Sequence, residues 1–249
     1  MFTTISALFW LCLFVPVIQC IPAGFETEVQ TSRGPDHESA ATEHDIVYCG
    51  GLHDPIITTT GDEEKGPGFW ITNRDVSGGN YFLYENSRDE HPWKSISIPE
   101  GKTAFVSVCN TWQGRVVRGN NQTNLDGKVH NLGTWFQSNV ASNGWMWGAV
   151  SFLQGCDGAG SVASTDDSKV VRLCYEDLLT GAPSSSLTAK ETGTKVLSKV
   201  VGDTPNQSAK DWELSKCNAS QVFIDESNDG PIIKSTNGRL EFIFWKGKA

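Results

Sequence analysis

The sequence predicts a mostly β domain, folded as a sandwich or a barrel, with one or two short helices. Short apolar or alternating runs follow one another along the chain and are separated by Gly, Asn and Asp. Turn signals recur between these runs, such as Asn143-Gly144 and Asn237-Gly238, which are typical of β-hairpins. Only one segment has convincing helical features. Many short strands with few helices indicate a sandwich or a barrel.

The predicted strands are apolar or alternating runs bounded by turn residues. In the run 103–109, alternation places Ala104, Val106 and Val108 on one face. The last run, from Leu240 to Trp245, is more heavily apolar, so we expect it to be an inner strand of a sheet. In chain order, the predicted strands are Phe69–Asn73, Asn80–Glu85, Ser95–Ile98, Thr103–Cys109, Gly114–Arg118, Gly133–Ser138, Gly144–Leu153, Ser161–Ala163, Val170–Tyr175, Lys195–Val200, Gln221–Ile224 and Arg239–Trp245.

The predicted helix follows the predicted strand Lys195–Val200 and precedes the predicted strand Gln221–Ile224. Ser208 can cap its start, Asp211 follows three residues later, and the segment ends before Cys217. A second, shorter helical turn is expected at Glu176–Thr180. These two segments account for all the helix that the sequence predicts.

Residues 1–20 have the composition of a secretory signal peptide. They contain no charged side chain, and the apolar run Ala7–Ile18 is too short to span a bilayer. We expect cleavage after Cys20, and cleavage after Ala23 is the alternative. The competing interpretation of residues 1–20 is a buried N-terminal helix. Residues 21–45 are polar and acidic, which favours a disordered arm or a pro-segment. The sequence therefore predicts a secreted protein with one domain over residues 46–249.

The net charge of −9 limits the class of partner. An acidic surface repels nucleic acid and anionic lipid, so we expect neither nucleic acid nor a membrane as a partner. The chain has no GxSxG, HExxH or P-loop motif. We expect a monomer without a cofactor.

The cysteines predict disulfides in an oxidising compartment. If Cys12 and Cys20 leave with the signal peptide, two disulfides and one thiol remain, and if Cys20 stays, three pairs can form. The pairing is left open by the sequence, and Cys156 with Cys174 is the most local option. The candidate disulfide cysteines are Cys49, Cys109, Cys156, Cys174 and Cys217.

Two further chemical features concern metals and modification. The only metal-ligand spacing that involves a cysteine and a histidine is Cys49-Gly-Gly-Leu-His53, which is weak, so we expect no metal. Three triplets match the acceptor pattern for N-glycosylation. They begin at Asn121, Asn206 and Asn218, which we expect to lie in surface loops.

The acidic residues and the tryptophans are the remaining candidates for function. Glycoside cleavage needs two facing carboxylates, but solvated acids at turns explain the acidic candidates equally well. These candidates are Asp157, Asp166, Asp167, Glu176 and Asp177. Most tryptophans are expected to fill the space between two sheets. Trp145 and Trp147 alternate on a predicted strand, so both should face one side, where they can stack on sugar or anchor a protein partner.

The middle of the chain resembles thaumatin-like proteins in the order and spacing of four segments. These segments are Ile98–Gly101, Gly114–Gly119, Leu132–Gln137 and Ala149–Gly155. The resemblance implies an all-β fold, an antiparallel β-sandwich, with an acidic cleft that binds or slowly cleaves β-1,3-glucan. The acidic positions of that cleft fall on Trp135, Met146, Ala149 and Gln154, none of which is acidic, whereas Arg115 and Arg118 match basic positions. Apolar and aromatic replacements suit binding better than acid–base catalysis.

The chain is also similar to uncharacterised secreted proteins of filamentous fungi that are candidate effectors. The shared segments resemble NLGTWFQ, SFLQGCDG and DLLTGAPS. This resemblance implies a secreted, non-enzymatic interaction protein that acts at the host surface or in the apoplast. The alternative is a protein of the cell wall that binds glycan or weakly cleaves β-1,3-glucan. For either partner, a host protein or a cell-wall glycan, the candidate binding residues are Trp135, Trp145, Trp147, Arg115 and Arg118.

Overall fold

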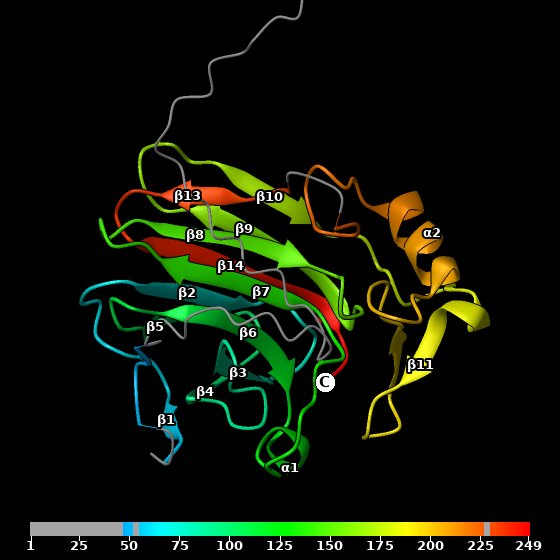
Figure 1. The fold of residues 1–249 in the computed structure, drawn as a ribbon, viewed down its shortest axis with the longest axis horizontal. Helices are drawn as coiled ribbons and strands as arrows, with labels where there is room; N and C mark the ends of the chain where they lie inside the picture. Colours follow the sequence, from blue (N-terminus) through cyan, green and yellow to red (C-terminus); the bar gives the residue numbers. More distant parts are fainter. Residues whose placement is uncertain (1–46, 52–54, 227–229) are drawn as a thin grey trace, which may run out of the picture. The chain divides into compact units, whose positions relative to one another are not determined.

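Strands dominate the computed structural model of the chain, with 39% strand and 9% helix (Figure 1). These proportions confirm the prediction of a mostly β protein. The structure describes residues 47–51, 55–226 and 230–249. The predicted signal peptide, 1–20, and the predicted arm, 21–45, lie outside the described residues. Within the described part, no helix has the length and apolar character needed to cross a membrane.

The larger of two main sheets has seven strands, in the order β1, β4, β3, β6, β7, β8, β13. Their bounds are β1 (Ile57–Thr59), β4 (Lys94–Ile98), β3 (Gly79–Glu85), β6 (Gln113–Gly119), β7 (Trp135–Val140), β8 (Met146–Ser151) and β13 (Ile233–Ser235).

The second sheet has five strands, in the order β10, β9, β14, β2, β5. Their bounds are β10 (Val171–Cys174), β9 (Gly158–Ser164), β14 (Arg239–Gly247), β2 (Gly68–Asn73) and β5 (Thr103–Ser107). A two-stranded sheet and three short helices complete the described chain. They are β11 (Leu187–Ala189), β12 (Lys195–Leu197), α1 (Asn121–Asn124), the 3-10 helix η1 (Ser184–Ser186) and α2 (Gln207–Lys216).

Both main sheets are mixed rather than purely antiparallel. Most neighbouring strands are antiparallel, but β1 pairs with β4 in parallel, and β14 pairs with β2 in parallel. The expectation of purely antiparallel sheets is therefore corrected. The reason is the position of β14 in the chain, since this last strand lies between β9 and β2 and has no hairpin to β2 that would force an antiparallel pairing.

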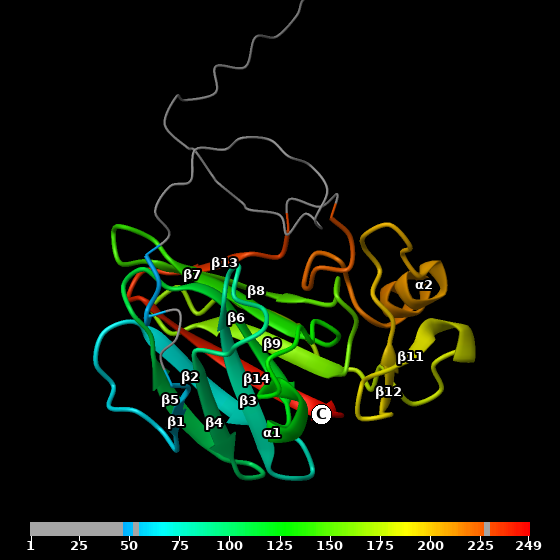
Figure 2. The same ribbon diagram turned by 60° about the horizontal axis from the view of Figure 1, so that its bottom comes forward.

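Aromatic rings fill the space between the two sheets, which form adjacent layers in Figure 2. Phe136 of β7 lies 4.9 Å from Phe242 and 4.4 Å from Phe244 of β14, measured between ring centroids. Tyr81 of β3 lies 4.4 Å from Phe244. Of the eight tryptophans beyond Trp10, only Trp112 is fully buried in this core. The expectation that most tryptophans fill the inter-sheet space is wrong, because phenylalanine and tyrosine occupy it.

Most predicted strands match observed ones within a few residues, and β14 is an inner strand as its apolar run indicates. The predicted strand 221–224 is wrong, since only Phe223 forms an isolated bridge there. Residues 176–180 form bends and turns instead of a helical turn. The strands β1, β11 and β13, of three residues each, were not predicted because such short segments carry little periodicity.

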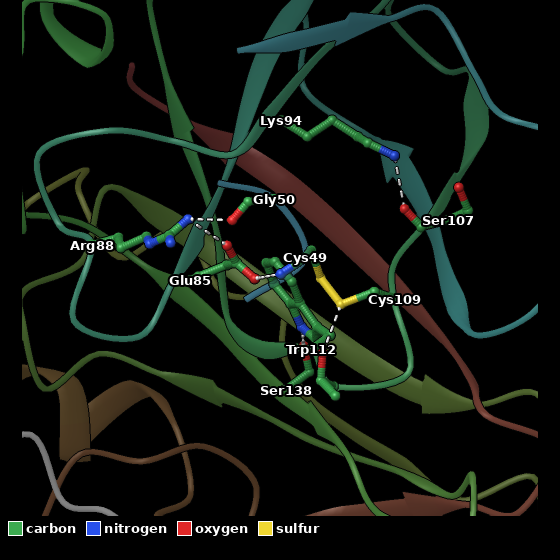
Figure 3. Close-up of a disulfide and its surroundings, with 10 residues drawn as sticks. Cys49, Gly50, Glu85, Arg88, Lys94, Ser107, Cys109, Trp112 and Ser138 are labelled. Atoms are coloured by element: carbon green, nitrogen blue, oxygen red, sulfur yellow. Dashed lines mark hydrogen bonds and ion pairs between the residues drawn. A yellow bond between two sulfur atoms is a disulfide. The ribbon is translucent and has the colours of Figure 1, made fainter. Parts of the chain in front are cut away.

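The structure joins Cys49 to Cys109 and Cys174 to Cys217, and Cys156 is a buried free thiol. The local pairing of Cys156 with Cys174 is therefore not formed. Figure 3 shows Cys49 beside Glu85 of β3, whose carboxylate accepts the Cys49 N–H at 2.6 Å. The Cys49–Cys109 bond closes a loop with a sequence separation of 60, which corresponds to about 4 kcal/mol of chain entropy. It fastens the start of the described chain to the end of β5.

Candidate functional site

The five predicted binding residues lie on three neighbouring strands or directly beside them. Arg115 and Arg118 lie on β6, Trp135 on β7 and Trp147 on β8, while Trp145 directly precedes β8. The strand order β6, β7, β8 brings these strands together. Their side chains nevertheless have three different environments, which decide what each can do.

Alternation along these strands defines two faces of the seven-stranded sheet. Val116, Phe136 and Val150 are cross-strand neighbours in the main core, so they point toward the second sheet. Side chains an odd number of positions away lie on the opposite face, which we call the outer face. Trp135 and Trp147 lie on the outer face, whereas Arg118 points to the core side.

Two tryptophans and a lysine form a surface at one end of this outer face. Trp145 and Trp147 are both half-buried, and Lys234 of the edge strand β13 is paired with Trp147. The Lys234 Nζ lies 4.2 Å from the centroid of the Trp145 ring and 5.6 Å from that of Trp147. Both rings therefore face one side, as their alternation predicts. We call these three residues the tryptophan–lysine surface.

This surface continues as a row of side chains across four strands. Lys234, Trp147, Asn139 and Gln113 are opposite one another in register on β13, β8, β7 and β6. Asn139 and Gln113 are exposed. The row thus offers an ammonium group, an aromatic ring and two amides, with no carboxylate among its four members.

Trp135 and Arg115 occupy a different, buried part of the outer face. Trp135 is 6% exposed, and its Nε1 donates to the Asn131 carbonyl at 2.9 Å. The Arg115 guanidinium lies 4.2 Å from the centroid of the Trp135 ring and forms an ion pair with Asp89 at 2.6 Å. Burial lowers the pKa of Arg115, while Asp89 opposes this shift. These two residues pack against the segment before β7 and are not presented to a ligand at the surface.

Arg118 belongs to a buried ionic network on the core side. Its guanidinium lies 4.0 Å from an oxygen of Asp157 and donates to the Asp157 carbonyl at 3.1 Å. Lys190 contacts the same carboxylate at 2.7 Å. A Cβ at Gly247 would collide with Arg118, so the glycine makes room for the guanidinium. Arg118 therefore holds the end of β14 and the start of β9 in place.

The acidic candidates lie in different surroundings. Asp157 is 1% exposed and is held by Lys190. Hydrogen bonds from Ser168 and Thr236 lower the pKa of Asp166. Hydrogen bonds from Thr180 and Lys246 lower the pKa of Asp177 in the same way. A carboxyl with a lowered pKa stays ionised and is a poor general acid. The remaining candidates, Asp167 and Glu176, are exposed.

Glu213 is the unusual titratable residue that the sequence did not single out. It is fully buried on α2, and neither carboxyl oxygen has a hydrogen-bond partner. Burial raises its pKa well above the usual value. Its charge contributes to the raised pKa of the Cys156 thiol, whose main cause is burial. Ala209, Glu213 and Cys217 are all buried and lie four residues apart. This spacing places them on one face of α2, which is the buried face.

The three glycosylation acceptors differ in their surroundings. Asn121 and Asn218 are exposed. Asn206 is half-buried and caps α2, where its Oδ1 accepts from the Ala209 N–H at 2.9 Å and its Nδ2 donates to the Ser185 carbonyl at 2.9 Å. The cap of α2 is thus Asn206, two residues before Ser208, which the sequence suggested as the cap.

Metal-ligating groups come together once among the described residues, at Cys49, Glu85 and Cys109. Both sulfurs there belong to the disulfide, so they are not available to a metal in this state. The predicted weak ligand His53 lies outside the described residues. The described groups therefore present no ready metal centre.

No protein-family model matches the chain. A search of curated proteins likewise gave no significant match. Among the described residues, the tryptophan–lysine surface is the exposed feature that best fits a binding role.

Proposed function

We propose that this protein is secreted and acts outside the cell as a non-enzymatic interaction protein, a fungal effector that binds a host protein at the surface or in the apoplast. Two disulfides support an oxidising compartment. The fold we propose is a thaumatin-like sandwich without its acidic cleft. Its support is the order of the four resembling segments and the facing of two sheets across one core.

The tryptophan–lysine surface is the observation that carries this proposal. Trp145 and Trp147 remain half-buried on a sheet face, where burial in a partner would remove further apolar area from water. Tryptophan is enriched among the residues that dominate interface energy. The thaumatin-like resemblance places acidic cleft residues at the positions of Met146 and Ala149. These two side chains are buried, with 0% and 3% exposure, which favours a contact face over a substrate groove.

The test is infiltration of plant tissue with purified protein, scored by induction or suppression of an immune response. Trp147→Ala should abolish the response. Trp70→Ala is the matched control, because Trp70 is equally half-buried but lies on the five-stranded sheet. Absence of any response from the native protein, or an equal response from Trp147→Ala, would overturn the proposal.

A second candidate function is binding to a cell-wall glycan, and the row Trp147, Asn139, Gln113 favours it. An aromatic ring stacks on a sugar face, and neighbouring amides can hydrogen-bond its hydroxyl groups. The test is co-sedimentation with insoluble β-glucan or chitin. Glycan binding requires that the native protein enters the pellet and that Trp145→Ala or Trp147→Ala releases it. Native protein that stays in the supernatant excludes this function.

A further inference from the structure

The edge strand β10 exposes an alternating row of apolar side chains. It is the last strand of the five-stranded sheet, and among the described strands it pairs only with β9. Val171 and Leu173 are 43% and 36% exposed, and Tyr175, directly after the strand, is 63% exposed. Their spacing of two places all three on one face of an extended chain. They make up three of the nine large apolar side chains that are exposed in the described chain.

The main chain of β10 has a free edge beside these side chains. The Val170 carbonyl accepts from the Ser164 N–H at 2.9 Å, so position 170 bonds toward β9. In an antiparallel pair, alternate residues bond to the same neighbour, which directs the N–H and C=O of Val171 and Leu173 away from β9. At that edge, the Val171 carbonyl accepts from the Arg172 guanidinium at 3.2 Å. An apolar edge of this kind is a template for another strand.

Arg172 is incompletely satisfied, and the charges along the strand are divided between its ends. The buried Nε of Arg172 has no hydrogen-bond partner, and no carboxylate in the described chain forms an ion pair with its guanidinium. Lys169 and Arg172 lie toward the start of the strand, and Glu176 and Asp177 lie beyond its end. Two such strands placed antiparallel bring the basic end of one to the acidic end of the other.

We propose that β10 pairs in antiparallel fashion with β10 of a second copy of this chain, around a two-fold axis at Leu173. In this register Leu173 lies opposite its own copy, and Val171 lies opposite Tyr175. These residues have the edge-directed main-chain groups, so they form the hydrogen-bonded pairs. The two five-stranded sheets become continuous across the axis. This proposed symmetric dimer differs from the monomer that the sequence analysis expects.

The charges favour this register, and they favour a second copy of this chain as the partner at the β10 edge. An axis at Arg172 would place two guanidinium groups directly opposite each other, which is unfavourable. An axis at Leu173 instead places Arg172 opposite Cys174, and it brings the end of one strand that follows Lys169 toward the end of the other that precedes Glu176 and Asp177. The strand is therefore complementary to itself in both its apolar and its charged residues, as an isologous interface requires. This edge belongs to a different sheet from the tryptophan–lysine surface, so the dimer and the proposed function can fail separately.

The first test is sedimentation equilibrium of the purified protein over a concentration series. The native protein should associate to a dimer, and Leu173→Asp should weaken dimerisation at least tenfold. Leu214→Asp is the matched control, because Leu214 is 45% exposed on α2 and the change is the same. In the native protein, hydrogen exchange at the amides of Val171 and Leu173 should slow as the concentration rises.

Charge reversal tests the register independently of the apolar contact. Arg172→Glu alone and Glu176→Arg alone should each weaken the dimer, and the double variant should recover at least part of the loss. A native protein that stays monomeric up to its solubility limit would overturn the proposal. So would a dimer that Leu173→Asp leaves intact, or a monomer that binds an unrelated apolar strand peptide at this edge.

Discussion

The buried carboxyl of Glu213 makes the stability of this protein depend on pH in a defined direction. Glu213→Gln keeps the shape of the side chain but removes the titrating group. Neither oxygen of Glu213 has a partner, and its pKa in the folded protein is raised well above that of the unfolded chain. A group of this kind contributes its full stability below the unfolded pKa, and this contribution is lost as the pH rises toward the folded pKa.

The magnitude follows from proton linkage. Each pH unit above the unfolded pKa of about 4.3 removes about 1.4 kcal/mol of the free energy of unfolding, until the folded pKa is reached. The total loss is this slope multiplied by the difference between the folded and unfolded pKa of Glu213. The amide of glutamine is uncharged at every pH, so Glu213→Gln should not show this loss. The variant should gain stability relative to the native protein as the pH rises.

The assay is urea unfolding of both proteins from pH 4 to pH 8, followed by tryptophan fluorescence with the disulfides intact. The difference between the two free energies of unfolding isolates Glu213, because all other titrating groups are common to both proteins. Asp166 and Asp177, whose pKa values are lowered, contribute less to the stability of both proteins as the pH falls. Because both proteins contain these residues, their effect cancels in the difference. A difference that stays constant from pH 4 to pH 8 would refute the reasoning.

Three further outcomes are expected. Asp157→Asn breaks the buried contact with Lys190, so it should lower the free energy of unfolding by about 3–5 kcal/mol, and a loss below about 1 kcal/mol in urea unfolding would contradict the network. Cys156 should react with a thiol reagent only after denaturation, since it is buried and its pKa is raised; rapid labelling of the native protein would disprove this. Asn206→Ala in non-glycosylated protein should cost about 1 kcal/mol through loss of the α2 cap, whereas Asn218→Ala, outside the helix, should cost less by the same measurement.

Local patterns predicted many of the strands but not the neighbours of each strand. The apolar run Leu240–Trp245 indicates an inner strand, and β14 does lie between β9 and β2. Its side chains alternate between buried and half-buried positions, so only one face of the strand is fully in the core. Its parallel partner β2 is distant in the sequence, and no turn links the two. The pairing depends on long-range packing, which leaves no periodic pattern in either segment.

The candidate site was predictable to a similar extent. Alternation places Trp145 and Trp147 on one face, but Lys234, which lies against both rings, is far along the chain on a strand of three residues. Trp135 alternates in the same way and yet is buried, because the segment with Asn131 covers it. Glu213 was missed because a glutamate in a helix is normally exposed, and only tertiary packing excludes water from it.

The position of β14 also bears on how the protein is made. This strand ends two residues before the end of the sequence and lies between β9 and β2. During synthesis, β9 and β2 therefore lack their shared neighbour until residues 239–247 have left the ribosome. Truncation ahead of Arg239 would leave two apolar edges open to aggregation, whereas a tag added after Ala249 leaves the strand whole. Assembly of the five-stranded sheet must wait until β14 has been synthesised.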